Sequence, residues 1–163
     1  MTKTIHAIWL GNCMPPISHV CLDDWKKMGF SYQLWTDDNE QIRSWIDNCE
    51  FAKSCYERKL FAFVSDYLRL KVLQKEGGLY LDTDVTIRRD PFPLFVGKSF
   101  AVGYETEDYL GTAAIYATPD SKILSELIGF YEGRIWNSPL YVGPQILTDV
   151  IKKGNFQALE SCL

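Results

Sequence analysis

The sequence shows no excess of positive charge. It has 17 Lys and Arg against 21 Asp and Glu, a formal net charge of −4, and its pI is near 5.2. Proteins that bind nucleic acids usually carry a basic stripe along the path of the phosphates. The charge balance therefore argues against a nucleic acid as partner, while it leaves the binding of a single nucleotide open.

Cysteine and histidine patterns for disulfides or zinc are also missing. The number of cysteines is odd and no two form a C-x-x-C pair; they are Cys13, Cys21, Cys49, Cys55 and Cys162. We expect free thiols, which are typical of a reducing cytosol. The histidines, His6 and His19, do not lie at metal-ligand spacing, so we expect His6 to be a hydrogen-bonded core residue.

Long apolar runs are absent as well. No stretch of about 18 apolar residues could span a membrane, and no charged segment followed by a hydrophobic one opens the chain. We expect no transmembrane segment and a cytoplasmic location, with any membrane contact peripheral. The hydrophobic share of 47% is ample for the core of one domain of 163 residues.

Residues 60–87 are the most informative stretch. Apolar residues recur at helical spacing from Phe61 to Leu73. They would cover most of the circumference of the helix, so a buried helix is predicted. Gly77 and Gly78 follow, and glycine can adopt the positive φ that ends a helix without steric cost. The next residues, Leu79-Tyr80-Leu81, predict a short buried strand.

Two carboxylates, Asp82 and Asp84, follow this strand with one residue between them. Open α/β sheets bind ligands at the carboxyl ends of their strands, and a turn there can bring both acids toward one hard divalent cation. Alternatively, the two residues only shape a turn or cap a helix, as Asp often does after a strand.

The charged residues Asp66 and Arg69 interrupt the apolar helix at i,i+3 spacing, which places both on one face. One explanation is a mutual ion pair that ties the helix to its neighbours. The other is that the pair reaches a polar ligand beside the two aspartates.

The remaining patterns alternate strands with helices. Strands are expected at residues 4–10, 30–35, 99–104 and 112–117, and helices at 17–28, from Asn39 to 46, and at 49–59, 123–131 and 145–153. The run Thr36-Asp37-Asp38-Asn39 supplies N-cap residues for the helix that ends at 46, either Asp120 or Ser121 can cap a later helix, and Pro144 suits a first helical turn. This order indicates an α/β nucleotide-binding domain.

The segments Phe61 to Leu70 and Gly77 to Val85 resemble the Asp-x-Asp glycosyltransferases related to yeast outer-chain mannosyltransferases, bacterial capsular polysaccharide transferases and the large clostridial toxins. The likeness extends to Ile5–Gly11, Trp25 and Leu34–Asn39, and it thins beyond residue 105. It implies a single-domain glycosyltransferase fold of the A type, with a mixed sheet flanked by helices. In that fold, residues 1–105 would bind nucleotide sugar and metal, and residues 106–163 would form a shortened acceptor side.

The resemblance also implies roles for individual residues. Asp82 and Asp84 would hold Mn²⁺ or Mg²⁺, and the catalytic set would be Asp66, Arg69 and Asp84. The implied donor-binding residues are Trp9, Asn39, Asp66, Arg69 and Asp82. Trp9 would stack on the base and Asn39 would lie near the nucleotide, although composition alone favours a core role for Trp9 and a loop role for Asn39.

Three functions fit these patterns. The first is metal-dependent transfer of a hexose from a nucleoside diphosphate sugar to a glycan, a lipid-linked glycan or another hydroxyl acceptor, by resemblance with retained anomeric configuration. The second is a phosphatase of the haloacid dehalogenase type, because the run from Asp82 to Thr86 also matches its Asp-x-Asp-x-Thr signature. That signature normally opens its domain, whereas residues 1–81 precede it here. The third is a non-catalytic module that binds nucleotide sugars.

Overall fold

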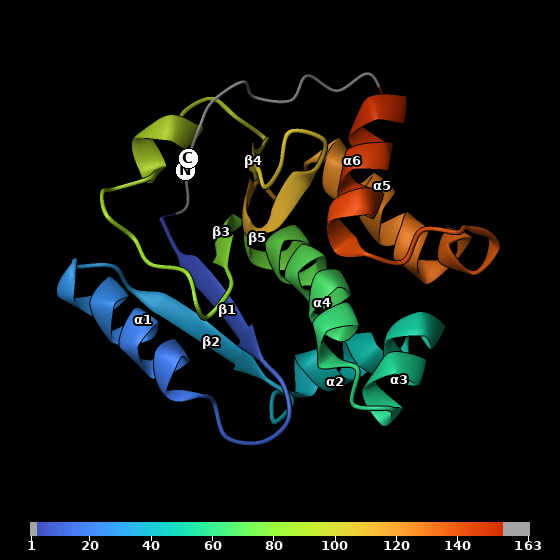
Figure 1. Ribbon diagram of the computed structural model, residues 1–163, viewed down its shortest axis with the longest axis horizontal. Helices are drawn as coiled ribbons and strands as arrows, with labels where there is room; N and C mark the ends of the chain where they lie inside the picture. The colour runs from blue at the N-terminus through green and yellow to red at the C-terminus, as the bar shows by residue number, and fades with distance from the viewer. Residues whose placement is uncertain (1–2, 155–163) are drawn as a thin grey trace.

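A computed structural model describes residues 3–154 of the chain, and Cys162 lies outside them. Its sheet consists of β1 (Ile5–Trp9), β2 (Tyr32–Thr36), β3 (Gly78–Leu81), β4 (Phe100–Tyr104) and β5 (Leu110–Ala117). The strand order is β2-β1-β3-β5-β4. Strand β1 pairs in parallel with β2 and β3, whereas β5 runs antiparallel to β3 and β4. The expected mixed sheet is confirmed (Figure 1).

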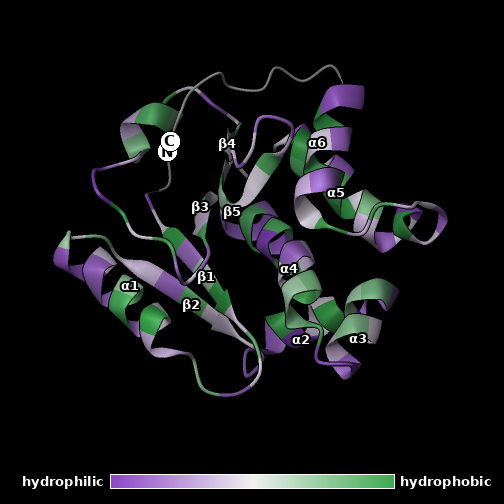
Figure 2. Ribbon diagram, in the orientation of Figure 1, coloured by the Kyte–Doolittle hydropathy of each residue, from purple (hydrophilic) through white to green (hydrophobic). Residues whose placement is uncertain are grey.

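Helices cover both faces of this sheet (Figure 1). They are α1 (Pro16–Lys27), α2 (Glu40–Asp47), α3 (Glu50–Glu57), α4 (Phe61–Glu76), α5 (Lys122–Glu132) and α6 (Gly143–Lys153), with 3-10 turns η1 (Phe92–Phe95) and η2 (Arg134–Asn137). Helices α2 to α6 share one hydrophobic core with the sheet, and α1 and η1 share the other. In Figure 2, hydrophobic and hydrophilic residues alternate along α1 and α6, as expected of helices that pack on one side.

Helix α4 is the central helix that the sequence predicts. Seven of its residues are buried, from Val64 to Leu73. It ends at Gly77, where φ is 65°, and Gly78 follows with a φ of 105°. A Cβ on Gly78 would lie 2.6 Å from the carbonyl oxygen of Thr4, so the close approach of β3 to β1 requires glycine at this position.

His6 is a hydrogen-bonded core residue, as predicted. Its Nε2 donates to the carbonyl oxygen of Gly77 at 2.9 Å, which leaves Nδ1 to accept from the indole N–H of Trp35 at 3.2 Å. Burial lowers the pKa of His6, against the opposing effect of the bond to Gly77. The neutral ring therefore links the end of α4 to β1 and β2.

The helix starts confirm one predicted cap and the predicted place of Pro144, and they correct another cap. Asn39 is the N-cap of α2 and accepts from two backbone N–H groups, and Pro144 lies in the first turn of α6. Ser121 is the N-cap residue of α5, but its side chain makes no capping bond. Its Oγ is buried without a hydrogen-bond partner in the described part of the chain, so the predicted capping bond at residue 120 or 121 is wrong.

Element ends differ from the sequence expectation by a few residues. The strand expected at 30–35 lies at Tyr32–Thr36, and the one expected at 112–117 begins at Leu110.

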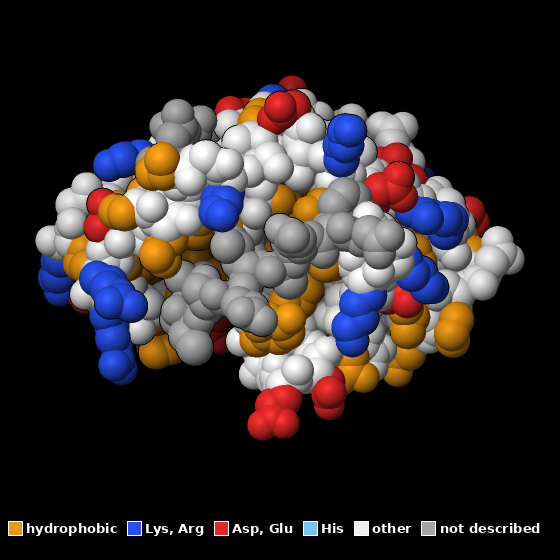
Figure 3. Space-filling view, turned by 90° about the horizontal axis from the view of Figure 1, so that it is seen from above, with side chains coloured by type: hydrophobic (Ala, Val, Ile, Leu, Met, Phe, Trp, Pro, Cys, Tyr) orange, Lys and Arg blue, Asp and Glu red, His pale blue; other side chains and the backbone are white. Residues whose placement is uncertain are grey.

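The four cysteines at positions 13, 21, 49 and 55 are free thiols, as expected. Within residues 3–154, no helix combines the length and apolarity needed to cross a membrane. On the face in Figure 3, basic side chains are scattered among acidic and uncharged ones.

Candidate functional site

The carboxyl ends of β1 and β3 lie where the chain reverses its direction of strand addition. From β1 the chain moves outward to β2, and then returns to place β3 on the other side of β1. Such a reversal separates the loops that follow the two central strands and leaves a crevice for ligands. Here the loop after β1 contains Gly11, and the segment after β3 contains Asp82 and Asp84.

Asp82 is held in place by two neighbours. Its Oδ1 accepts a hydrogen bond of 2.7 Å from the hydroxyl of Tyr80 and lies 3.5 Å from Nη1 of Arg69. The side chain remains 33% exposed. No hydrogen bond or ion pair among the described residues uses Oδ2, so this oxygen can bind a ligand.

Arg69 contacts both Asp66 on α4 and Asp82 at the end of β3. Its Nη2 lies 3.0 Å from Oδ1 of Asp66, and the exposed fractions of the two side chains are only 6% and 14%. Nε donates to the Ser65 carbonyl at 3.1 Å, and Nη1 donates to the Thr112 carbonyl. The guanidinium carbon lies 4.7 Å from the centre of the Tyr80 ring. The ion pair considered as one alternative is therefore present, and it also extends to Asp82.

Gly143 is part of this network, and the sequence argument missed it. It is the first residue of α6, and its backbone N–H lies close enough to the Asp66 carboxylate to favour the anion. A Cβ at this position would lie 2.7 Å from all three carboxyl atoms of Asp66. The only sequence signal is a glycine directly before Pro144 at a helix start, which does not reveal a contact with a residue 77 positions earlier.

Protonation states follow from burial in this network. Burial raises the pKa of the Tyr80 hydroxyl well above its usual range, so Tyr80 stays protonated and donates to Asp82. Burial also raises the pKa of the Asp66 carboxyl, while Arg69 and the Gly143 N–H oppose that rise. Because both opposing groups favour the anion, we describe Asp66 as the ionised partner of Arg69.

Asp84 lies on the other side of a turn from Asp82. The Val85 N–H bonds to the Asp82 carbonyl at 3.1 Å and closes the turn. Thr83, between the acids, is buried and its Oγ1 lies 2.9 Å from the Ser18 hydroxyl of α1. This bond anchors the turn to α1, while the Asp84 side chain is exposed to solvent.

The carboxylate oxygens of Asp82 and Asp84 are the type of ligand that hard divalent cations prefer. No group of three or more His, Cys, Asp or Glu that could hold a metal occurs within residues 3–154. Mg²⁺, however, is commonly bound by one or two carboxylates together with substrate phosphates and water. Oδ2 of Asp82 and the exposed carboxylate of Asp84 could serve as two such ligands, and an ion held by them would depend on a bound diphosphate for the rest of its shell.

At the end of β1, Trp9 is neither in the core nor fully exposed. Its side chain is half-buried, and its indole N–H donates to the Asn12 carbonyl at 2.7 Å. This differs from the core position that composition favours. The bond fixes the ring beside the β1 loop, where it remains accessible to a ligand.

The β1 loop is also fixed by Asp37, a second residue that the sequence argument missed. Its Oδ2 accepts from the Gly11 N–H at 3.0 Å and from the Tyr56 hydroxyl at 2.6 Å. The bond to Asp37 raises the pKa of Tyr56 to about 12. Gly11 has a φ of 81°, and a Cβ there would lie 2.5 Å from the Phe61 ring. The sequence feature that could have indicated this role is the position of Asp37, an acidic residue directly after β2.

Asn39 follows Asp37 by two residues and already has a structural role. Its Oδ1 accepts from the N–H groups of Gln41 at 2.9 Å and Ile42 at 3.3 Å. These bonds satisfy two of the free donors at the start of α2. The amide oxygen is therefore occupied, and a contact with a nucleotide would have to use the amide nitrogen.

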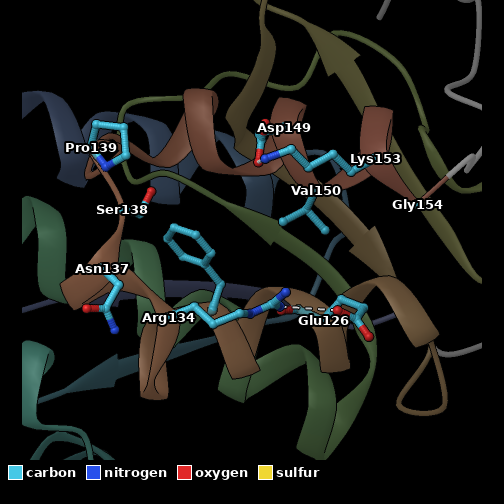
Figure 4. Close-up of a pocket in the computed structure, with 10 residues that line it drawn as sticks. Glu126, Arg134, Asn137, Ser138, Pro139, Asp149, Val150, Lys153 and Gly154 are labelled. Carbon is cyan, nitrogen blue, oxygen red and sulfur yellow. Dashed lines mark hydrogen bonds and ion pairs between the residues drawn. The ribbon is translucent and has the colours of Figure 1, made fainter.

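A cavity of about 710 Å³ lies elsewhere, between α5, η2 and α6 (Figure 4). Its charged side chains already pair with one another, Arg134 with Glu126 at 3.1 Å and Lys153 with Asp149 at 2.8 Å. None of the six predicted site residues lines it. This cavity is therefore not the site that the sequence predicts.

A mixed sheet with flanking helices and strand-end carboxylates defines the A-type fold of nucleotide-sugar transferases. The structure superposes on the solved PaToxG glycosyltransferase with a TM-score of 0.71 at 19% identity, over 93% of this chain and 69% of that one. Residues 19–101, just over half of the chain, match the family described as the glycosyltransferase sugar-binding region containing a DXD motif. The chain belongs to this family. Trp9 lies before the matched segment, whereas Asp66, Arg69, Asp82 and Asp84 lie inside it.

Two curated relatives are similar to parts of this chain. The chain is 29% identical over 124 residues to subversion of eukaryotic traffic protein A of Legionella pneumophila, which covers 56% of this chain and 18% of that protein. It is 29% identical over 114 residues to the lactosylceramide 4-alpha-galactosyltransferase of Mus musculus, covering 67% of this chain and 30% of the relative. The chain thus spans less than a third of the length of either relative.

Proposed function

We propose that this chain binds a nucleoside diphosphate sugar at the ends of β1 and β3 and transfers its hexose to a hydroxyl acceptor, a glycan or lipid-linked glycan. The observation that carries the proposal is the network in which Arg69 joins Asp66 to Asp82. It makes the helical pair and the Asp-x-Asp motif parts of one site. Family membership favours this function over a phosphatase of the haloacid dehalogenase type.

Asp82 and Asp84 are the proposed ligands of a Mn²⁺ or Mg²⁺ ion. When bound, such an ion neutralises the charge that develops on the departing diphosphate. Tyr80 and Arg69 orient Asp82 so that Oδ2 is directed to the ligand, because both hold Oδ1. A fixed carboxylate needs no reorientation when the diphosphate leaves, which is how preorganised groups lower a barrier.

Asp66 and Arg69 are the proposed contacts to the donor sugar, with Asp66 accepting from sugar hydroxyls. Their heads are held by the packing of Gly143 against Asp66, by the bond of Arg69 to Ser65 and by the ion pair between them. This fixed geometry holds the anomeric carbon in one orientation relative to the acceptor, and positioning of this kind contributes strongly to group-transfer rates. We propose retention of the anomeric configuration, on the family resemblance alone.

Trp9 is the proposed platform for the base, and Asn39 would contact the nucleotide through its amide nitrogen. The half-buried indole beside the Gly11 loop supports the first role. Residues 1–105 would then bind the donor and the metal, and residues 106–163 would provide the acceptor side. The free thiols in the described residues are consistent with the reducing cytosol proposed as its compartment.

The test is release of nucleoside diphosphate from a panel of UDP- and GDP-hexoses with Mn²⁺, Mg²⁺ or EDTA. We expect release with at least one donor, dependent on the metal and abolished in Asp84→Ala. Hydrolysis of simple phosphate monoesters without nucleotide release would instead support the phosphatase. Calorimetric binding of the nucleotide sugar without turnover would support a non-catalytic module.

A further inference from the structure

An exposed aromatic pair borders the proposed sugar site and has no role in the contacts described above. Tyr141 is 58% exposed, and its ring centre lies 6.1 Å from that of Phe63, with 52° between the ring planes. Phe63 is half-buried and packs against the main core. Large exposed aromatic side chains next to a polar site commonly mark a binding surface, because their burial is favourable and their orientation is fixed.

Both rings belong to segments that adjoin Asp66. Phe63 precedes Asp66 by three residues on α4, a spacing that places the two side chains on adjacent parts of one helical face. Tyr141 precedes Gly143 by two residues, and Gly143 lies against the Asp66 carboxylate. The two rings of the aromatic pair therefore come from α4 and from the segment directly before α6, both of which adjoin that carboxylate.

The order of groups along the site assigns the pair to one end. Asp82 contacts Arg69, Arg69 contacts Asp66, and Asp66 lies against Gly143 at the start of α6, two residues after Tyr141. The proposed diphosphate side lies at Asp82 and the donor sugar lies along Arg69 and Asp66. In this series of contacts Tyr141 is next to Asp66, at the sugar end.

We infer that Tyr141 and Phe63 form a platform for the acceptor sugar, a hexopyranoside whose apolar C–H face packs on the Tyr141 ring. This inference rests on the proposed transferase function. A pyranose offers C–H groups on one face and hydroxyls at its edge, so it matches an aromatic face beside a carboxylate. Stacking holds the acceptor while its hydroxyl edge faces Asp66 and the donor.

The experiment measures sugar binding directly, by saturation-transfer NMR with methyl α- and β-hexopyranosides of glucose, galactose and mannose. We expect transfer to the ring protons of one sugar face for at least one glycoside. Tyr141→Ala should weaken that binding by about tenfold, the factor that corresponds to about 1.4 kcal/mol. Phe63→Leu removes a ring but keeps an apolar side chain, and it should also weaken binding.

Tyr104→Ala is the matched control, because Tyr104 on β4 is a tyrosine of similar exposure, 54%. It should bind the glycosides like the wild type, and UDP or GDP affinity in Mn²⁺ should be unchanged in Tyr141→Ala. No transfer to any glycoside in the wild type, or equal transfer in Tyr141→Ala, overturns the platform. Failure of the transferase proposal is a separate result, since it appears as absent nucleotide release whatever the NMR shows.

Discussion

Replacing Arg69 by methionine removes the centre of the site network without leaving a large cavity. The guanidinium is 6% exposed and lies between the carboxylates of Asp66 and Asp82. Breaking a buried ion pair by removing one partner costs about 3–5 kcal/mol, because the other charge stays buried and unpaired. At roughly 2–4 °C per kcal/mol for a chain of this length, we expect Arg69→Met to lower the Tm by about 6–20 °C.

The conservative variants separate stability from function. Arg69→Lys keeps the positive charge but loses the fork that reaches both carboxylates and two backbone carbonyls. Asp66→Asn keeps the shape and loses the charge. If the pair positions the donor sugar, both variants should lower kcat more than they weaken nucleoside diphosphate affinity, because the lost contacts are to the sugar. Turnover per folded molecule and calorimetric affinity are measured on the same preparations.

Arg134→Met is the matched control for the stability measurement. Arg134 pairs with Glu126 at a similar distance of 3.1 Å, but both side chains are more than half exposed. Exposed pairs typically contribute about 0–1 kcal/mol, so its Tm should hardly change. Equal melting temperatures for Arg69→Met and Arg134→Met would refute the energetic argument. A large loss of stability in Arg69→Lys with normal turnover per folded molecule would remove the pair from the site.

Three further predictions concern other parts of the site and the core. Asp84→Ala should abolish metal-dependent donor binding in calorimetry and leave the Tm unchanged, because the exposed carboxylate contributes to ligand binding and not to packing. Trp9→Ala should weaken UDP or GDP binding by about 1–3 kcal/mol, the usual contribution of base stacking, and nucleotide should quench tryptophan fluorescence in the wild type. Stability should fall as pH drops below about 6.5, because the pKa of His6 is lowered in the folded state and the unfolded chain takes up the proton first. The loss should level off below the folded pKa and be smaller in His6→Gln, as measured by thermal melting from pH 7.5 to pH 5.

Each of these predictions has a matched control in the same chain. Asp108→Ala removes another exposed acid and should leave donor binding intact. Trp136→Ala removes a 54% exposed tryptophan of η2 and should keep nucleotide affinity. His19→Gln changes the exposed histidine and should keep the wild-type pH dependence of the Tm. Unchanged donor affinity in Asp84→Ala at saturating Mn²⁺ contradicts the metal assignment, and unfolding of Trp9→Ala with normal affinity in Trp9→Phe makes Trp9 a core residue.

Local patterns were sufficient to predict the elements that carry the site. The apolar spacing from Phe61 to Leu73 and the glycine at position 77 determine α4 and its end, because both act within one or two helical turns. Asn39 and Pro144 determine helix starts for the same reason. The short strand β3 and the two acids after it follow directly in the sequence. These features placed Asp82 and Asp84 at a strand end before any contact was known.

Contacts between distant segments were decided only by the tertiary structure. Periodicity shows that Asp66 and Arg69 share a helical face, but it cannot show that Arg69 reaches Asp82 or that Gly143 lies against Asp66. Those contacts depend on the pairing of β3 with β1 and β5 and on how α6 packs, and no residue within a helical turn encodes them. The missing capping bond of Ser121 has the same origin, since sequence indicates which side chain can cap a helix but not where it points once buried.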